Sequence, residues 1–133
     1  MITMNIHEEM FARNFVNPKK RDRYLSLLDT SKGRSKVVHG LDHCEDIDSR
    51  YANQAPVDQQ NPDAIEKMLR QKGAPEVCHV MSSNPEIDEK EMPLREALKK
   101  TIGMGMGTLI SCIPGRLAYF EHEDAGERYI LER

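Results

Sequence analysis

Apolar residues in the first half of the chain recur with helical spacing, and capping signals mark where helices begin. Two Asn-Pro pairs precede such stretches; asparagine caps the free amide groups of a helix, and proline at the first helical position sacrifices no hydrogen bond. They predict helices over about 18–29 and 62–72. A short helix capped by Ser31 and an opening helix over about 6–15 complete this part, and the polar, proline-containing stretch 50–60 is predicted to be a loop.

The pattern changes to short, β-rich runs after the second of these helices. Residues 76–83 have the pattern of a strand and 93–102 that of an amphipathic helix, and three further strands are predicted over 108–113, 116–122 and 127–132. The connections between the last three strands are short and turn-prone, so these strands should form an antiparallel meander.

This order of elements predicts an α+β fold, with residues 1–133 in a single domain. The N-terminal helices, over about 1–73, should pack on one side of a small mixed or antiparallel sheet. Residues 76–133 form that sheet in the order β-α-β-β-β and end in the three-stranded meander. If the strand at Val77 pairs with the strand at Leu109, the helix between them makes a right-handed crossover.

The charge and the cysteine pattern argue against several classes of protein. A formal net charge of -3 and a pI near 6.0 disfavour a general nucleic-acid binder and a membrane-surface protein, which usually carry a large basic excess. Three cysteines without a CxxC pair disfavour a disulfide framework and a zinc ribbon. No apolar run is long enough to span a bilayer, and the polar beginning does not resemble a signal peptide. We therefore expect a soluble, cytoplasmic protein.

Three glycines at alternate positions, in the stretch GMGMG, invite comparison with a phosphate-binding loop. A dinucleotide-binding loop follows a strand and opens a helix, whereas these glycines follow the helix at 93–102, so the negative end of its dipole faces them. The pattern therefore favours a helix stop at Gly103. Gly105 and Gly107 are candidates for ligand binding, because a backbone without side chains allows a ligand to approach closely.

Two pairs of side chains are candidates for site chemistry. His79 and Cys112 lie on strands that can be neighbours, and a thiol within hydrogen-bond reach of an imidazole supports nucleophilic catalysis; free cysteine is also commonly a small buried hydrophobe. His39 and His43 stand one helical turn apart and could bind one metal ion if further ligands came from elsewhere, although both also fit a solvent-exposed helix face.

Basic residues are concentrated in the segment 13–36. Against two acidic residues it contains eight basic ones: Arg13, Lys19, Lys20, Arg21, Arg23, Lys32, Arg34 and Lys36. The two helices predicted here are joined by a short turn similar to helix-turn-helix geometry, which makes Lys19, Lys20 and Arg23 candidates for nucleic-acid contact. Charged residues are common on solvated helix faces, however, and the acidic net charge argues against this partner.

No catalytic motif with distinctive spacing is visible, and no motif specifies a cofactor. The sequence therefore favours a small binding or regulatory domain that acts through protein or ligand contacts, including self-association through an edge strand. Two alternatives stay open: an enzyme with a cysteine–histidine site at the sheet, and a weak nucleic-acid binder that uses the basic segment.

Overall fold

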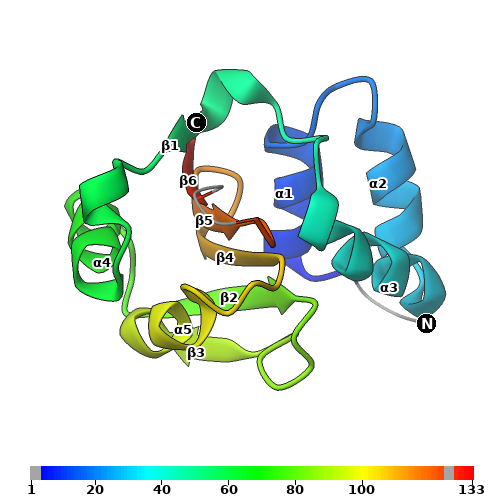
Figure 1. The fold of residues 1–133 in the computed structure, drawn as a ribbon. Helices are drawn as coiled ribbons and strands as arrows, with labels where there is room; N and C mark the ends of the chain where they lie inside the picture. The colour runs from blue at the N-terminus through cyan, green and yellow to red at the C-terminus, as the bar shows by residue number, and fades with distance from the viewer. Residues whose placement is uncertain (1–3, 125–127) are drawn as a thin grey trace.

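The computed structural model describes residues 4–124 and 128–133 (Figure 1). The α-helices are α1 (Ile6–Asn14), α2 (Arg21–Leu28), α3 (Ser31–Gly40), α4 (Pro62–Gln71) and α5 (Leu94–Thr101). The strands are β1 (Ala52–Gln54), β2 (Val77–Ser82), β3 (Glu91–Pro93), β4 (Thr108–Ile113), β5 (Leu117–Glu121) and β6 (Arg128–Glu132). Within the described part of the chain, no helix is long and apolar enough to cross a membrane.

The strands form one antiparallel sheet in the order β1-β6-β5-β4-β2-β3, which confirms the α+β class. β4, β5 and β6 make the predicted meander; residue 127 of its last predicted strand lies outside the described residues. β2 also pairs antiparallel with β4, so α5 does not form the crossover that we expected between these two strands. Because β3 reverses the chain before α5 begins, α5 instead connects β3 with β4, which run in the same direction on either side of β2.

Helices cover both faces of the sheet, so the molecule has three layers (Figure 1). The helices α1, α2 and α3 pack on one face, in a core that includes Phe11 and Phe120. The helices α4 and α5 pack on the other face, in a core that includes Leu69 and Val80. The expectation that the helices lie on one side was therefore wrong. Almost every residue of β2, β4 and β5 is buried, and a sheet with apolar residues on both faces needs cover on both.

The Asn-Pro pairs at 17–18 and 61–62 have different effects on the backbone. At α4 the prediction is confirmed: Asn61 caps the helix by accepting a hydrogen bond from the amide of Ala64 at 2.9 Å. At the first pair, Asn17 accepts from the amide of Lys19 at 3.1 Å and the chain makes a turn, so that α2 begins only at Arg21. The same capping side chain therefore closes a turn in one place and starts a helix in the other.

Candidate functional site

The structure separates the two residues of the expected cysteine–histidine pair. His79 of β2 is paired with Ser111 of β4, and both side chains lie on the sheet face covered by α1. Cys112 follows Ser111 directly, and successive side chains of a strand point to opposite faces. Cys112 therefore lies in the core beneath α4 and α5 with Cys78, whose hydrogen bond, together with burial, raises the pKa of the Cys112 thiol. The expected pair of nucleophile and base is not formed.

His79 belongs instead to a buried charged network that ties α1 and α3 to the sheet. Its Nε2 atom lies 2.7 Å from a carboxylate oxygen of Glu8 in α1, and its Nδ1 atom lies 2.6 Å from one of Glu91 in β3. Arg34 of α3 donates two hydrogen bonds to Glu8, at 2.8 and 2.9 Å, and two to Asp88, at 2.8 and 2.9 Å. Glu8 is 4% exposed and His79 is 3% exposed, so these charges compensate one another away from water.

The two carboxylates favour the protonated form of His79. A neutral imidazole has one N–H group, whereas both ring nitrogens of His79 face a carboxylate, so both carboxylates receive a hydrogen bond only from the imidazolium. Burial lowers the pKa of His79, but the hydrogen bonds to Glu8 and Glu91 outweigh this effect and the pKa is raised. Burial also acts to raise the pKa of Glu8, but the hydrogen bonds from His79 and Arg34 lower it overall.

A second histidine, His7, extends the network to Ser111. The rings of His7 and His79 stack with their centroids 5.4 Å apart, and the Nδ1 atom of His7 lies 2.7 Å from the hydroxyl oxygen of Ser111. Burial and the nearby charge of His79 lower the pKa of His7, which favours the neutral ring that can accept the serine proton. Serine and histidine at this distance are the residue types of a nucleophile and its base. Ser111 is only 3% exposed, however, which shields its hydroxyl from a substrate, so we assign the network to holding α1 and α3 on the sheet.

The glycines after α5 set the direction of the chain and its packing. Gly103 has a φ of +85°, in agreement with the predicted helix stop. Gly107 is buried, and a Cβ atom there would overlap the backbone of Leu41 and Asp42. The space at Gly107 is therefore filled by the chain itself, which argues against its candidate role in ligand binding. Gly105 is exposed with a φ of +71°, and its candidate role stays a prediction.

The two histidines of the candidate metal site make separate contacts. His39 contacts a residue of its own helix: its Nδ1 atom lies 3.3 Å from the hydroxyl of Ser35. The Nδ1 atom of His43 instead lies 2.7 Å from the carboxylate of Glu123, which follows β5. The expected helical spacing is interrupted because α3 ends at Gly40 and a 3-10 turn carries His43. Over residues 4–124 and 128–133, no group of three or more His, Cys, Asp or Glu side chains could hold a metal ion. The structure thus gives no support to this site.

The candidates for nucleic-acid contact gather at the beginning of α2. Lys19 and Lys20 lie in the turn before this helix and Arg23 lies in its first turn, and all three side chains are exposed. The structure therefore brings these predicted residues together on the surface of the α1–α3 layer.

A pocket of about 330 Å³ opens between the segment 44–52 and the ends of β5 and β6. We call it the loop pocket; its lining residues are Cys44, Glu45, Ile47, Ser49, Ala52, Phe120, His122, Asp124 and Tyr129. Several of these, among them Phe120 and Ile47, also belong to or pack against the core beneath α1–α3. The loop pocket therefore has an apolar floor and a polar rim.

Hydrogen bonds hold the segment 44–52 against the end of α1. The amide of Asn17 donates to the carbonyl oxygen of Asp46 at 2.7 Å, and the amide of Asp48 donates to the carbonyl oxygen of Phe15 at 2.7 Å. The hydroxyl of Tyr24 donates to the carboxylate of Asp46 at 2.7 Å. One wall of the loop pocket is thus fixed by the fold itself, as is usual for small-molecule sites.

The lining of the loop pocket combines negative charge with aromatic rings. Glu45 and Asp124 are exposed at its rim, and Glu45 forms no ion pair with any described residue. Within the pocket, the His122 ring stands edge-on to Phe120 with the centroids 6.2 Å apart. Burial raises the pKa of Cys44, which keeps its side chain in the thiol form at neutral pH. The pocket therefore offers carboxylates and aromatic side chains to a ligand, and its thiol is not activated as a nucleophile.

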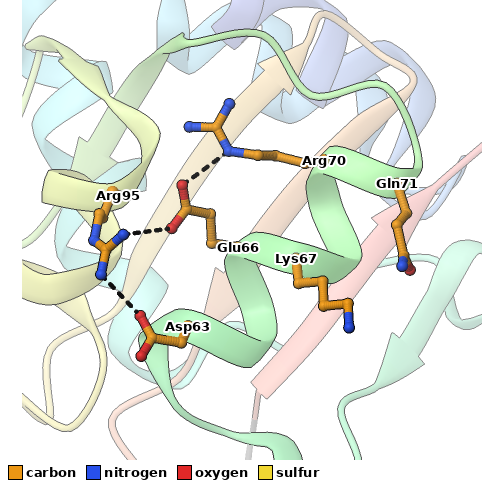
Figure 2. Close-up of a pocket in the computed structure, with 6 residues that line it drawn as sticks. All are labelled: Asp63, Glu66, Lys67, Arg70, Gln71 and Arg95. Carbon is orange, nitrogen blue, oxygen red and sulfur yellow. Dashed lines mark hydrogen bonds and ion pairs between the residues drawn. The ribbon is translucent and has the colours of Figure 1, made fainter.

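A larger and more open groove lies between α4 and α5 (Figure 2). It measures about 600 Å³ and is lined by Asp63, Glu66, Lys67, Arg70, Gln71 and Arg95. Figure 2 shows that most of its charged side chains pair with one another, Arg95 with Asp63 at 3.2 Å and Arg70 with Glu66 at 2.8 Å. These charges are already compensated, whereas Glu45 of the loop pocket forms no ion pair with a described residue, so the loop pocket is the better candidate for a binding site.

Comparison of the chain with known protein families, with curated proteins and with solved structures finds no match. The candidate site therefore rests on its own geometry. The only trace of the loop pocket in the sequence is the acidic run over 42–48, which supplies part of its rim.

Proposed function

We propose that this chain is a small binding domain that holds a small cationic ligand in the loop pocket. The observation that carries the proposal is the combination of a pocket of about 330 Å³, an aromatic interior and carboxylates at the rim. Its volume lies within the range of small-molecule sites, which are mostly apolar with a few convergent polar groups.

The charges at the rim favour a cation over an anion. Glu45 and Asp124 attract a positive group, and the half-buried ring of Tyr129, which lies beside the buried Phe120 on the neighbouring strand, adds a surface for cation–π attraction. An amine with an apolar or aromatic body would place its charge at the rim and its body against the floor. A carboxylate of the same size would meet two like charges.

The edges of the sheet give less support to self-association by strand pairing. The edge strands β1 and β3 have three residues each, and short edge strands leave little backbone for a partner strand. The catalytic alternative also loses its support, since His79 and Cys112 lie on opposite faces. Ligand contact is therefore the form of binding that we propose.

Thermal unfolding with a matched pair of probes tests this function. We expect phenethylamine to raise the melting temperature of the protein and phenylacetate, which has the same ring and the opposite charge, to leave it unchanged. At ten times its Kd, a ligand that binds only the folded state adds about 1.4 kcal/mol to the free energy of unfolding.

Charge variants test whether the rise in melting temperature comes from binding in the loop pocket. We expect the double variant Glu45→Gln/Asp124→Asn to lose the response to phenethylamine. The control Asp58→Asn/Glu86→Gln removes two exposed carboxylates elsewhere and should keep the response. The proposal is wrong if both probes shift the melting temperature equally, or if the control loses the response as fully as the pocket variant.

A further inference from the structure

Five exposed cations at one end of the molecule pair with no described carboxylate. They are Lys19, Lys20, Arg23, Lys32 and Lys36, on α2, on α3 and in the turn before α2, and we call this surface the basic face. Figure 1 shows α2 and α3 together at this end of the α1–α3 layer. Most arginines elsewhere are neutralised, as in the pairs of Arg70 with Glu66 and Arg95 with Asp63. Other exposed cations without a described carboxylate partner, such as Lys67, Lys99 and Arg116, lie on separate elements, whereas the basic face groups five of them on two adjacent helices and the turn before them.

The exposed residues of α3 form one continuous stripe. Ser31, Lys32, Ser35, Lys36 and His39 recur at the spacing that places residues on one side of a helix, and all five are exposed. The stripe contains no carboxylate and no apolar side chain. The side chains that pack against the core, such as those of Val37 and Val38, lie on the opposite side of α3.

The junction of α2 and α3 is tight and fixed. Two residues, Asp29 and Thr30, separate the helices, and the hydroxyl of Thr30 caps α3 by accepting from the amide of Gly33 at 3.0 Å. Gly33 is buried where a Cβ atom would overlap the carbonyl oxygen of Leu27 in α2. The two helices therefore present Arg23, Lys32 and Lys36 from a rigid support, with Lys19 and Lys20 in the turn directly before α2.

From these observations we propose that the basic face binds the phosphate backbone of a double-stranded nucleic acid. A membrane-binding helix needs an apolar face, and a single-strand binder needs aromatic rings on which bases stack; the α3 stripe has neither. Lysine and arginine side chains on two rigidly joined helices, with small serines between them, fit a regular phosphate backbone. This activity is separate from ligand binding in the loop pocket and does not depend on it.

The acidic net charge of the chain is compatible with this partner because the charges are unevenly placed. The basic face contains two exposed acidic residues, Asp22 and Asp29, against five cations, whereas Glu45 and Asp124 lie at the loop pocket. An uneven charge of this kind orients the molecule toward a polyanion, and the attraction weakens steeply with added salt.

Fluorescence anisotropy with labelled DNA and RNA duplexes of one sequence, from about 50 to about 200 mM salt, tests the proposal. With five phosphate contacts, the logarithm of the binding constant should fall against the logarithm of salt with a slope of about -4 to -5. The variant Lys19→Gln/Lys20→Gln/Arg23→Gln should lower the magnitude of this slope by about 3 units, and Lys32→Gln/Lys36→Gln by about 2. Each variant should bind at least about tenfold more weakly at the lowest salt.

The control Lys67→Gln/Lys99→Gln/Arg116→Gln removes three exposed cations outside the basic face and should bind like the wild type. Binding to either duplex supports the proposal, and the tighter of the two identifies the natural source of phosphate. Absence of binding to both at low salt overturns it. Equal binding to phosphatidylserine vesicles or to polyglutamate also overturns it, as does an equal loss of binding in the control.

Discussion

Replacing Glu8 by Gln should destabilise the protein strongly, because Glu8 is the centre of the buried charged network. Its carboxylate accepts two hydrogen bonds from Arg34 and one from His79, and the residue is 4% exposed. A glutamine has the same shape but no charge, and its amide group would direct N–H donors at the donors of Arg34 or His79. Two buried cations would lose their shared counter-charge.

The remaining contacts set the size of the effect. Breaking a buried ion pair by removing one partner costs about 3–5 kcal/mol. Arg34 keeps both hydrogen bonds to Asp88, and His79 keeps its contact with Glu91 at 2.6 Å, so neither cation is left alone. We therefore expect the lower end of this range, about 3 kcal/mol, which is a large fraction of the stability of an ordinary domain.

Urea unfolding followed by circular dichroism measures this loss. With a slope of about 2 kcal/mol per molar urea, the midpoint should fall by about 1.5 M. Glu9→Gln is a matched control on the same helix: Glu9 pairs with Arg13 at 2.9 Å, but both side chains are substantially exposed, so it should lose less than about 1 kcal/mol. If Glu8→Gln lowers the midpoint no more than Glu9→Gln does, the network does not hold α1 on the sheet.

The histidines of the network, the glycines after α5 and the cysteines give three further predictions. Because the pKa of His79 is raised in the folded state, stability should fall as the pH rises above 6.5 toward that pKa. Because the pKa of His7 is lowered, stability should also fall as the pH drops below 6.5. Urea midpoints should therefore peak near pH 6.5, and a midpoint that still rises at pH 8 would contradict this assignment. Gly107→Ala should lower the free energy of unfolding by about 2 kcal/mol or more, because the added Cβ overlaps packed backbone. Gly103→Val should lower it by about 1 kcal/mol, because Gly103 has a positive φ that a β-branched residue disfavours. Melting temperatures that match the wild type would refute both. Ellman's reagent should modify half-buried Cys44 before any thiol in the core beneath α4 and α5, and the reverse order, seen by peptide mapping, would show that this core opens first.

Local signals in the sequence were enough to predict a helix or strand where the element is long and residues close in the chain determine where it begins or ends. The cap at Asn61, the helix stop at Gly103 and the strand at 108–113 depend on residues close in the chain. The edge strands β1 and β3 were missed because three residues are too few for a periodic pattern, and long-range pairing alone defines them.

The sequence also contained a sign of the second helical layer. The stretches VCHVMS and TLISCI lack a strict alternation of apolar and polar residues, which is typical of strands buried on both faces. The apolar strand residues therefore pointed to cover on both faces, although the predicted fold covered only one.

The candidate sites depend on residues that only the fold brings together. Glu8 and His79 are 71 positions apart, and the loop pocket joins the segment 44–52 to residues beyond 119. No short motif can encode such contacts. Conversely, residues close in the sequence can have different roles in the fold. Arg34 belongs to the basic segment of the sequence, yet its charge is paired in the buried network and does not contribute to the basic face.

Titration of the ¹⁵N-labelled protein with phenethylamine, followed by NMR, tests the central claim most directly. Binding in the loop pocket predicts saturable shifts of the amide signals of residues 44–52, of 120–124 and of Tyr129, and none from phenylacetate at the same concentration. The signals of α4 and α5, which line the other groove, should stay in place. Shifts centred on that groove, or the absence of saturable shifts around the loop pocket, would contradict the proposed function.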